Sequence, residues 1–264
     1  MPHIKVSQEV HEALDHEHPV VGLESTIFSH LGLPSPHNQE ALRRCTDAIR
    51  SQGAVPAVTA ILDGVPRVGL EDHEIERILG PARKTAERDI VVATAQRWPV
   101  GATTVSASLA LCAEVGVPVF ATGGIGGVHH GSEATGDISS DLGAIALHTV
   151  VTVCAGAKAF LDIPKTLEFL ETESVPVLGY QTDDFPMFYA RSSGVPAPVR
   201  VQSPKEVALI LAHRIRWEQG GVLLGVPVPE RDAIPAPDIQ GAIDTALERS
   251  RDMRGAEVTP YILE

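Results

Sequence analysis

Helix-like segments along this chain repeatedly lead, after a glycine or a proline, into short apolar runs. The clearest helix-like segments span 40–52, 104–115, 165–173 and 204–219. The runs that follow them read QGAVPAVTAIL, GVPVFATGG, SVPVLGY and GGVLLGVPVP. Because glycine and proline end helices, and short β-branched runs are typical of buried strands, this pattern predicts helices that alternate with strands.

Two further apolar runs, 20–23 and 150–154, also have the composition of buried strands, although no convincing helix directly precedes the first. Alternating elements favour an α/β fold, with a central, mainly parallel or mixed sheet covered on both faces, in a single domain over 1–264. The charged stretch 70–85 is expected to form a helix that covers one edge. The proline-rich segment 226–237 predicts an irregular connection to a last helix over 238–251, and the apolar ending VTPYILE looks like the beginning of another helix.

Composition excludes several classes of protein. Hydrophobic residues make up 44% and charged residues 21% of the chain, which is ordinary for a globular protein. The net charge of −13 repels a nucleic acid backbone, so no nucleic acid partner is expected. No run is apolar enough to cross a membrane and the first residues lack a signal peptide, which predicts a cytoplasmic protein. The cysteines Cys45, Cys112 and Cys154 are widely spaced and are interpreted as reduced thiols.

Ligands of α/β proteins collect at the carboxyl ends of strands, so the residues that follow each apolar run are candidates for chemistry. Glu24, Ser25 and Thr26 follow the run 20–23. They are equally compatible with an acid or base and with a turn that caps a helix. After VPVFAT comes the glycine-rich loop 123–131, whose backbone N–H groups are suited to an anion such as phosphate. A flexible turn is the alternative.

The segment Asp137-Ile138-Ser139-Ser140-Asp141 offers two carboxylates and two hydroxyls. If it begins a helix, both carboxylates lie on one face, where a hard divalent cation is accommodated. By spacing alone, a helix cap without a ligand is the simpler interpretation.

Lys158 follows the run 150–154 and three small residues, and it is one of only five lysines among 21 basic residues. An amine at a buried strand end is suited to Schiff-base chemistry, although a lysine that reaches the surface is the alternative.

Together, several strings closely resemble the pseudouridine-5′-phosphate glycosidase family, also known as the indigoidine synthase A-like family. They are VVGLESTIFSHLGLPSP, QGAVPAVTAILDGVPRVGL, GATTVSASL, VFATGGIGGVHHG, DISSDL, VTVCAGAK and GYQTDDFPMFYARSS. The resemblance implies an α/β/α sandwich that assembles as a homotrimer, binds Mn²⁺ or a similar divalent cation, and reversibly cleaves the C–C bond of pseudouridine 5′-phosphate to uracil and ribose 5-phosphate.

The same resemblance implies roles for individual residues. Lys158 matches the nucleophile, Glu24 the proton donor and Asp137 the metal ligand. The residues that match substrate contacts are Lys84, Val105, His129, Ser139, Ser140 and Asp141. The chain departs from the family at 85–89, where TAERD replaces the usual VSRRD, and at His130, where arginine is common. It also ends at Glu264, whereas the family continues into a further helix.

Two other functions remain open from the sequence. One is a Schiff-base lyase or glycosidase that acts on another C-linked ribose phosphate. The other is a truncated protein that binds ribose phosphate without turnover. The presence of Glu24, Asp137 and Lys158 together favours an enzyme.

Overall fold

The computed structural model describes residues 4–235, 238–239 and 241, and its chain divides into two compact units after Ala121. In the first unit, five strands form a sheet in the order β1 (Lys5–Val6), β4 (Val65–Val68), β3 (Val55–Leu62), β2 (Val20–Leu23) and β7 (Val119–Ala121). The strand β6 (Val100–Thr103) pairs with the far half of β3, and β5 (Arg83–Thr85) pairs with β6. β3 is antiparallel to β4 and β6, whereas the other pairs are parallel.

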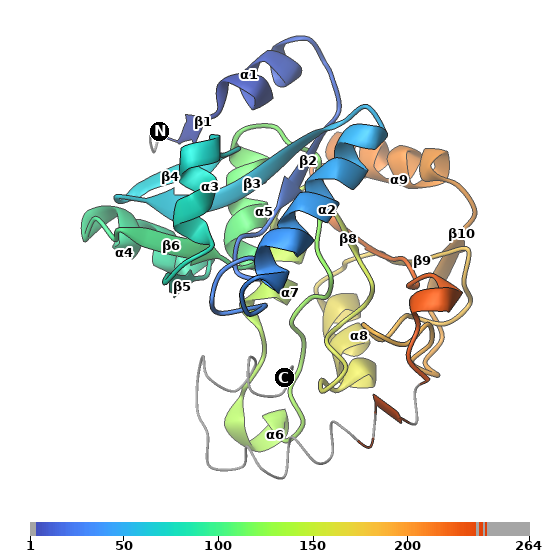
Figure 1. Cartoon of the computed structure of the whole chain (residues 1–264). Helices are drawn as coiled ribbons and strands as arrows, with labels where there is room; N and C mark the ends of the chain where they lie inside the picture. Colours follow the sequence, from blue (N-terminus) through green and yellow to red (C-terminus); the bar gives the residue numbers. More distant parts are fainter. Residues whose placement is uncertain (1–3, 236–237, 240, 242–264) are drawn as a thin grey trace. The chain divides into compact units, whose positions relative to one another are not determined.

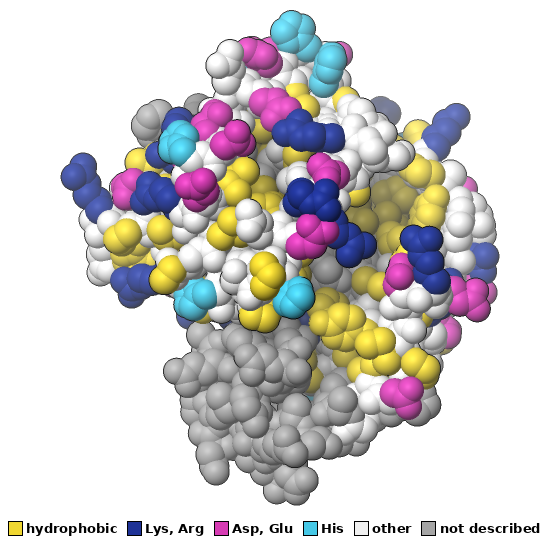
Figure 2. All heavy atoms as spheres, in the orientation of Figure 1, with side chains coloured by type: hydrophobic (Ala, Val, Ile, Leu, Met, Phe, Trp, Pro, Cys, Tyr) yellow, Lys and Arg dark blue, Asp and Glu magenta, His cyan; other side chains and the backbone are white. Residues whose placement is uncertain are grey.

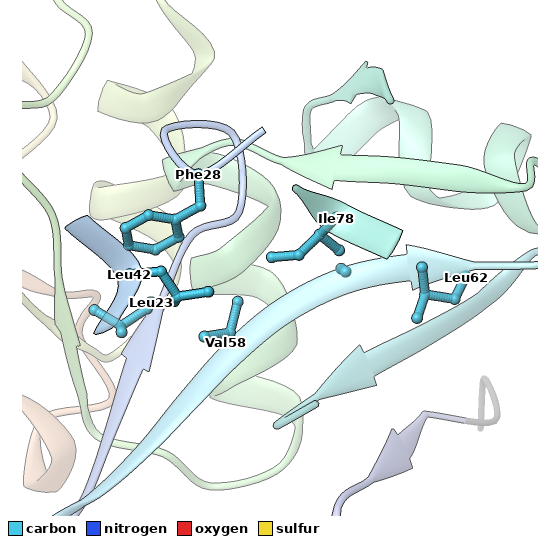
Figure 3. Close-up of a cluster of buried hydrophobic side chains, with 7 residues drawn as sticks. Leu23, Phe28, Leu42, Val58, Leu62 and Ile78 are labelled. Carbon is cyan, nitrogen blue, oxygen red and sulfur yellow. The ribbon is translucent and has the colours of Figure 1, made fainter. Parts of the chain in front are cut away.

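Helices cover both faces of this sheet (Figure 1). The helices of the unit are α1 (Gln8–Asp15), α2 (His37–Ser51), α3 (Asp72–Ile78), α4 (Ile90–Ala95) and α5 (Val105–Glu114), with a 3₁₀ turn at Glu87–Asp89. On one face, Leu42 of α2 and Ile78 of α3 pack with Leu23 and Val58 of β2 and β3 (Figure 3). On the other, Gly22 faces α5, because a Cβ at Gly22 would lie 2.4 Å from the Cys112 sulfur.

The second unit contains a parallel sheet in the order β8 (Val151–Cys154), β11 (Val222–Gly225), β9 (Val177–Tyr180) and β10 (Val199–Val201). Its helices are α6 (Ser132–Thr135), α7 (Ser140–Leu147), α8 (Ile163–Thr172) and α9 (Pro204–Arg216), with a 3₁₀ turn at Glu230–Asp232. Val207 and Leu211 of α9 pack on Val151, Leu178 and Val222 to form the core of this unit. Pro204 stands in the first turn of α9 and Ser203 caps it, which explains where that helix begins.

The predicted α/β fold, with sheet strands flanked by helices, is confirmed. The four predicted helices are present as α2, α5, α8 and α9, with ends shifted by a few residues. The sheet is mixed, as the prediction of a mainly parallel or mixed sheet allowed, since β3 has antiparallel neighbours. Two other expectations are wrong in part. The segment 70–85 holds the helix α3 but ends in the strand β5. A helix, α1, does precede β2, and Ser7 caps it.

Other expectations remain predictions. The segment 226–235 is irregular apart from its 3₁₀ turn, as predicted. The last helix, 238–251, falls almost entirely outside the described residues, and the ending 258–264 lies wholly outside them. The single domain over 1–264 stays a prediction, because two compact units can be parts of one domain. The three cysteines are free thiols, with Cys112 and Cys154 buried and Cys45 exposed.

Figure 2 shows acidic and basic side chains interspersed over α1 to α3 rather than gathered by sign. Arg43 and Arg50 of α2 illustrate this, since Arg43 pairs with Glu40 and Asp47 and Arg50 pairs with Glu9. None of the described helices combines the length and the apolar character that crossing a bilayer requires.

Candidate active site

Glu24 directly follows β2, as the sequence predicted, and its side chain is half-buried. Hydrogen bonds fix both of its neighbours in the chain, Leu23 and Ser25. The Leu23 carbonyl accepts a hydrogen bond from the Thr59 hydroxyl at 3.2 Å, and the Ser25 hydroxyl accepts one from the Thr103 N–H at 2.9 Å. The acid or base interpretation of Glu24 therefore has a fixed backbone to support it.

Lys84 and Val105 lie beside this strand end in the first unit. Lys84 is exposed on β5 and stands opposite Ala102 of β6. Val105 is the first residue of α5, directly after β6 and Thr104, and its side chain is buried. β2 and β6 both pair with β3, and their ends meet beside its middle, where Ser25 bonds to Thr103. Because β5 pairs with β6, the segments that carry Glu24, Lys84 and Val105 lie near one another.

In the second unit, the backbone before Lys158 runs beside the glycine-rich loop. The Ala155 N–H donates to the Gly123 carbonyl at 3.0 Å, and the Lys158 N–H donates to the Ile125 carbonyl at 3.0 Å. Gly156 has a φ of 100° and lies so close to Pro186 that a Cβ would be 1.9 Å from its carbonyl oxygen. Only glycine fits there. The backbone that carries Lys158 is therefore fixed just after the end of β8, and the lysine side chain is half-buried.

The neighbouring thiol is a poor competitor for a nucleophilic role. Burial raises the pKa of Cys154, the last residue of β8, to about 12. A thiol with such a pKa is protonated at neutral pH, and the thiolate is the reactive form. Cys154 is therefore not a candidate nucleophile at this strand end.

Part of the glycine-rich loop is held by bonds to the protein itself, and its predicted binding of an anion stays a prediction. The N–H groups of Ile125, Gly126, Val128 and His129 all donate to protein acceptors: the Gly156 carbonyl, the Asp141 carboxylate, the Thr166 hydroxyl and the Asp137 carbonyl. The glycines also allow close packing. A Cβ at Gly124 would lie 2.4 Å from the Phe188 ring, and one at Gly127 would lie 2.5 Å from the Thr166 hydroxyl. The loop is a packed support for the residues around it.

The expectation that Asp137 and Asp141 share a helix face is wrong. The helix α7 begins at Ser140, and Ser139 caps it by accepting a hydrogen bond from the Asp141 N–H at 3.3 Å. Asp137 therefore precedes the helix. Asp141 is buried, and its carboxylate accepts the Gly126 N–H at 2.9 Å. Asp141 thus holds the glycine-rich loop, and its predicted contact with substrate stays a prediction. Ser140 is exposed at the first turn of α7.

Asp137 and His129 face each other on neighbouring segments, joined by the backbone bond from the His129 N–H to the Asp137 carbonyl. The His129 Nδ1 lies 3.9 Å from a carboxylate oxygen of Asp137, whose side chain is 64% exposed. The described residues contain no cluster of three or more side chains suited to hold a metal. An exposed single carboxylate fits a hard cation that keeps most of its water ligands, and does not fit a closed metal centre.

The close approach of Gly126 to α7 makes a first prediction. In Gly126→Ala, the new Cβ would lie 2.2 Å from the Ser139 hydroxyl and 2.9 Å from the Asp141 carboxylate. We expect thermal unfolding to show that the free energy of unfolding of this variant is roughly 1–3 kcal/mol lower than that of the parent protein. The matched control is Gly143→Ala in the helix α7, where a Cβ meets no atom within 4 Å. The free energy of unfolding of this control should be about 0.5–1 kcal/mol higher than that of the parent protein, because alanine is favoured over glycine within a helix. Equal stability of the two variants would contradict the packing of the loop.

The fold and these strand-end residues define an α/β protein with a lysine, carboxylates and hydroxyls where such proteins bind small ligands. Within that class, the chain belongs to the family described as indigoidine synthase A like protein, whose model matches residues 9–264. The chain is 46% identical to the pseudouridine-5′-phosphate glycosidase of Solibacter usitatus, over 99% of this chain and 88% of that protein. It is 44% identical to the enzyme of the same name from Arabidopsis thaliana, over 98% and 80%.

Two solved structures are similar to this one. The prealnumycin C-glycosynthase AlnA, in complex with ribulose 5-phosphate, matches with a TM-score of 0.87 at 37% identity, over 98% of this chain and 85% of that chain. An indigoidine synthase A-like protein from Thermotoga maritima matches with a TM-score of 0.85 at 36% identity, over 93% and 82%. The structural and sequence relatives agree on the family.

Proposed function

We propose that this chain is a pseudouridine-5′-phosphate glycosidase, which reversibly converts pseudouridine 5′-phosphate and water to uracil and ribose 5-phosphate. The observation that carries the proposal is the 46% identity, over nearly the whole chain, to proteins of that name. The strand-end positions of Glu24 and Lys158 are consistent with this chemistry. The truncated, non-catalytic alternative is disfavoured because the close relatives are named as enzymes.

The bond to be broken explains why an amine is needed. In an N- or O-glycoside, protonation of the heteroatom produces a leaving group, but C5 of uracil has no lone pair to protonate. A pair of carboxylates, which serves most glycosidases, is therefore poorly suited to this substrate. A neutral amine can instead form a covalent bond to the sugar and then supply its lone pair to expel the base.

In the proposed mechanism, the Lys158 amine attacks C1′ while the bond from C1′ to the ring oxygen breaks, and Glu24 gives that oxygen a proton. The Glu24 carboxylate then takes a proton from the attached nitrogen, which restores the nitrogen lone pair. That lone pair forms a C=N bond as the C1′–C5 bond breaks, and the departing pair on C5 of uracil takes up the proton that Glu24 holds. Water adds to the resulting imine, which releases ribose 5-phosphate and regenerates the amine. Each step is general acid–base or nucleophilic chemistry of the chain's own residues.

Substrate binding is assigned to groups in each unit that match the family's substrate contacts. Lys84, exposed on β5, supplies a positive charge for phosphate, and Val105 offers its backbone at the start of α5, because its side chain is buried. His129, Ser139 and Ser140 supply polar groups for the sugar phosphate. Asp141 supports this set through its bond to Gly126. The positions 85–89, which depart from the family, follow directly on Lys84.

A divalent cation such as Mn²⁺ is proposed at Asp137, where an exposed carboxylate would hold it among water ligands. When bound, such a cation neutralises and orients anionic substrate groups. We further propose that the chain acts in the cytoplasm as a homotrimer. Sedimentation equilibrium would measure the mass of the assembly, and a monomer at micromolar concentration would contradict the trimer.

A second candidate function is favoured by one observation. The structural neighbour at 37% identity is named as a C-glycosynthase, and its complex contains ribulose 5-phosphate. The same lysine chemistry, run in the direction of synthesis, would join a pentose phosphate to another carbon nucleophile. The higher identity to the glycosidases places this candidate second.

Product analysis separates the candidates. The purified protein is incubated with pseudouridine 5′-phosphate, and uracil and ribose 5-phosphate are measured by chromatography. The proposal predicts release of both in equal amounts, and reformation of substrate when both are supplied. Failure with uracil but C–C bond formation with another aromatic acceptor would favour the synthase. Binding of ribose 5-phosphate without turnover of any C-glycoside would favour the non-catalytic alternative.

Removal of metal provides a second prediction. Because the proposed cation is held by one exposed carboxylate and water, a chelator should strip it readily. We expect dialysis against EDTA to lower uracil release at least about tenfold, and added Mn²⁺ to restore it, because a bound cation stabilises developing charge by several kcal/mol. Asp137→Asn should raise the Mn²⁺ concentration required, whereas the exposed Asp183→Asn should not. Full activity in EDTA would remove Asp137 as a metal ligand.

A further inference from the structure

Four hydroxyl side chains form a connected cluster inside the first unit. They belong to Ser25, Thr59, Thr103 and Ser108, and none of them is exposed to solvent. The Thr59 hydroxyl lies 2.8 Å from those of Thr103 and Ser108, and the Ser25 hydroxyl lies 3.1 Å from that of Thr103. We call these residues the buried hydroxyl cluster.

The cluster lies on the α5 side of the sheet. Val58 points into the apolar core beneath α2 (Figure 3), and strand alternation directs the next residue, Thr59, to the opposite face. There its hydroxyl meets Ser108 of α5, whose own hydroxyl donates to the Thr104 carbonyl at 2.8 Å. The cluster thus joins β3, β6 and the first turn of α5.

Bonds of the cluster reach the Leu23 carbonyl, just before Glu24, and the Thr104 carbonyl, just before Val105, while the Thr103 hydroxyl donates to the Thr59 carbonyl at 2.8 Å. On one side of Glu24, the Thr59 hydroxyl lies 3.2 Å from the Leu23 carbonyl and shares its one proton between that oxygen and the Ser108 hydroxyl. On the other side, the N–H groups of Ser25 and Thr26 both donate to the Thr103 carbonyl, at 3.3 and 3.1 Å. The Thr26 hydroxyl donates to the same carbonyl at 2.7 Å. The segment that carries Glu24 is therefore fastened before and after that residue.

Stability alone is a weak reason to bury four hydroxyls. A satisfied internal hydrogen bond contributes only about 0.5–1.5 kcal/mol, and replacing both partners by apolar groups of the same shape is nearly neutral. A connected cluster in a low-dielectric core does fix geometry, because each bond has a restricted length and direction. What this cluster fixes is the end of β2 relative to the start of α5.

We propose that the buried hydroxyl cluster is the positioning device for Glu24, with Thr59 as its central residue. This inference rests on the proposed function, in which Glu24 supplies a proton. The cluster touches no substrate atom in this account. It acts by holding the Glu24 backbone so that the carboxyl group meets the sugar ring oxygen, a step in which a displacement of about 1 Å costs roughly 10²-fold in rate.

The test compares Thr59→Val with two matched variants. Thr59→Val keeps the shape of the side chain and removes its hydroxyl, whereas Thr59→Ser keeps the hydroxyl. Thr152→Val serves as the control, since Thr152 is an equally buried strand residue whose hydroxyl has no partner among the described residues. Activity is measured as kcat and KM for uracil release. Thr59→Val should lower kcat about 10–100-fold with KM changed less than about twofold. Thr59→Ser and Thr152→Val should stay within about threefold of the parent protein.

A double-mutant cycle identifies the residue through which Thr59 acts. Because the proposed effect passes through Glu24, Thr59→Val should lower kcat no further in a protein that already carries Glu24→Gln. An equal further loss in that background would overturn the inference, as would an equal loss of kcat in Thr152→Val. A change in KM alone would also overturn it.

Amide hydrogen exchange keeps the inference testable even if pseudouridine 5′-phosphate is not the substrate. The N–H groups of Ser25 and Thr26 should exchange at least about tenfold faster in Thr59→Val than in Thr152→Val. Both N–H groups donate to the Thr103 carbonyl, and Thr59→Val removes the hydrogen bond between the Thr59 and Thr103 hydroxyls. Unchanged exchange would overturn the positioning role. If exchange is faster in Thr59→Val but the parent protein does not cleave pseudouridine 5′-phosphate, the buried hydroxyl cluster does hold the backbone beside Glu24, and the proposed substrate is rejected.

Discussion

Replacement of Lys158 by arginine, Lys158→Arg, is expected to lower kcat for uracil release by at least about 10³-fold, because loss of a covalent nucleophile has the largest effect of any single change. Arginine keeps the positive charge and most of the length of lysine. It does not deprotonate in proteins, and so it cannot supply the lone pair that attacks C1′. The measurement is steady-state release of uracil, followed by absorbance or chromatography.

The matched control is Lys205→Arg, an exposed lysine in the first turn of α9. Its activity should equal that of the parent protein. Thermal unfolding of both variants shows whether any loss comes from the fold. If Lys158→Arg folds normally and retains more than about a tenth of the activity, the lysine is not the nucleophile.

The second large effect is expected for Glu24→Gln. Glutamine has the same shape and can still accept a hydrogen bond, but it has no acidic proton to give to the ring oxygen. General acid–base catalysis typically contributes about 10²–10⁴-fold, and kcat should fall by that amount. The dependence of kcat/KM on pH should also lose the limb that Glu24 produces in the parent protein.

Glu9→Gln is a suitable control, since Glu9 lies on α1 in an exposed ion pair with Arg50, and such pairs contribute little. This control should leave kcat unchanged. A Glu24→Gln variant that keeps both the rate and the pH profile of the parent protein would show that another group supplies the proton.

Much of the fold could be predicted because the local signals agree with the tertiary structure. The helix α9 begins at Pro204 behind the Ser203 cap, and the strand β2 has the bounds that its apolar run indicates. The hairpin between β3 and β4 also has a local signal, since the pair Asp63-Gly64 is typical of a tight hairpin turn. Both residues have the positive φ that such a turn requires. This hairpin produces an antiparallel part of the mixed sheet, whereas the regular alternation of helices and strands indicated the parallel neighbours.

The candidate residues at strand ends could be predicted because position along an α/β chain already implies location. Glu24 and Lys158 follow β2 and β8 as the apolar runs indicated. The role of the glycine-rich loop could not be predicted, since composition does not show which N–H groups find acceptors. Asp141, fifteen residues away, bonds to Gly126, and Thr166, thirty-eight away, bonds to Val128. These contacts between distant segments are fixed only by tertiary packing.

The buried hydroxyl cluster was hidden for the same reason. Ser25, Thr59 and Thr103 are separated in sequence by dozens of residues and look individually like helix caps or strand residues. Only the pairing of β3 with β6 brings Thr59 and Thr103 together.

The central claim is that Lys158 forms a covalent bond to the sugar. The most direct measurement is incubation with ribose 5-phosphate and borohydride, which reduces an imine to a stable amine, followed by peptide mapping with mass spectrometry. The account predicts one pentose phosphate on the peptide that contains Lys158, and none there in Lys158→Arg or when borohydride is omitted. Absence of the sugar from Lys158, or equal labelling of Lys205, would contradict it.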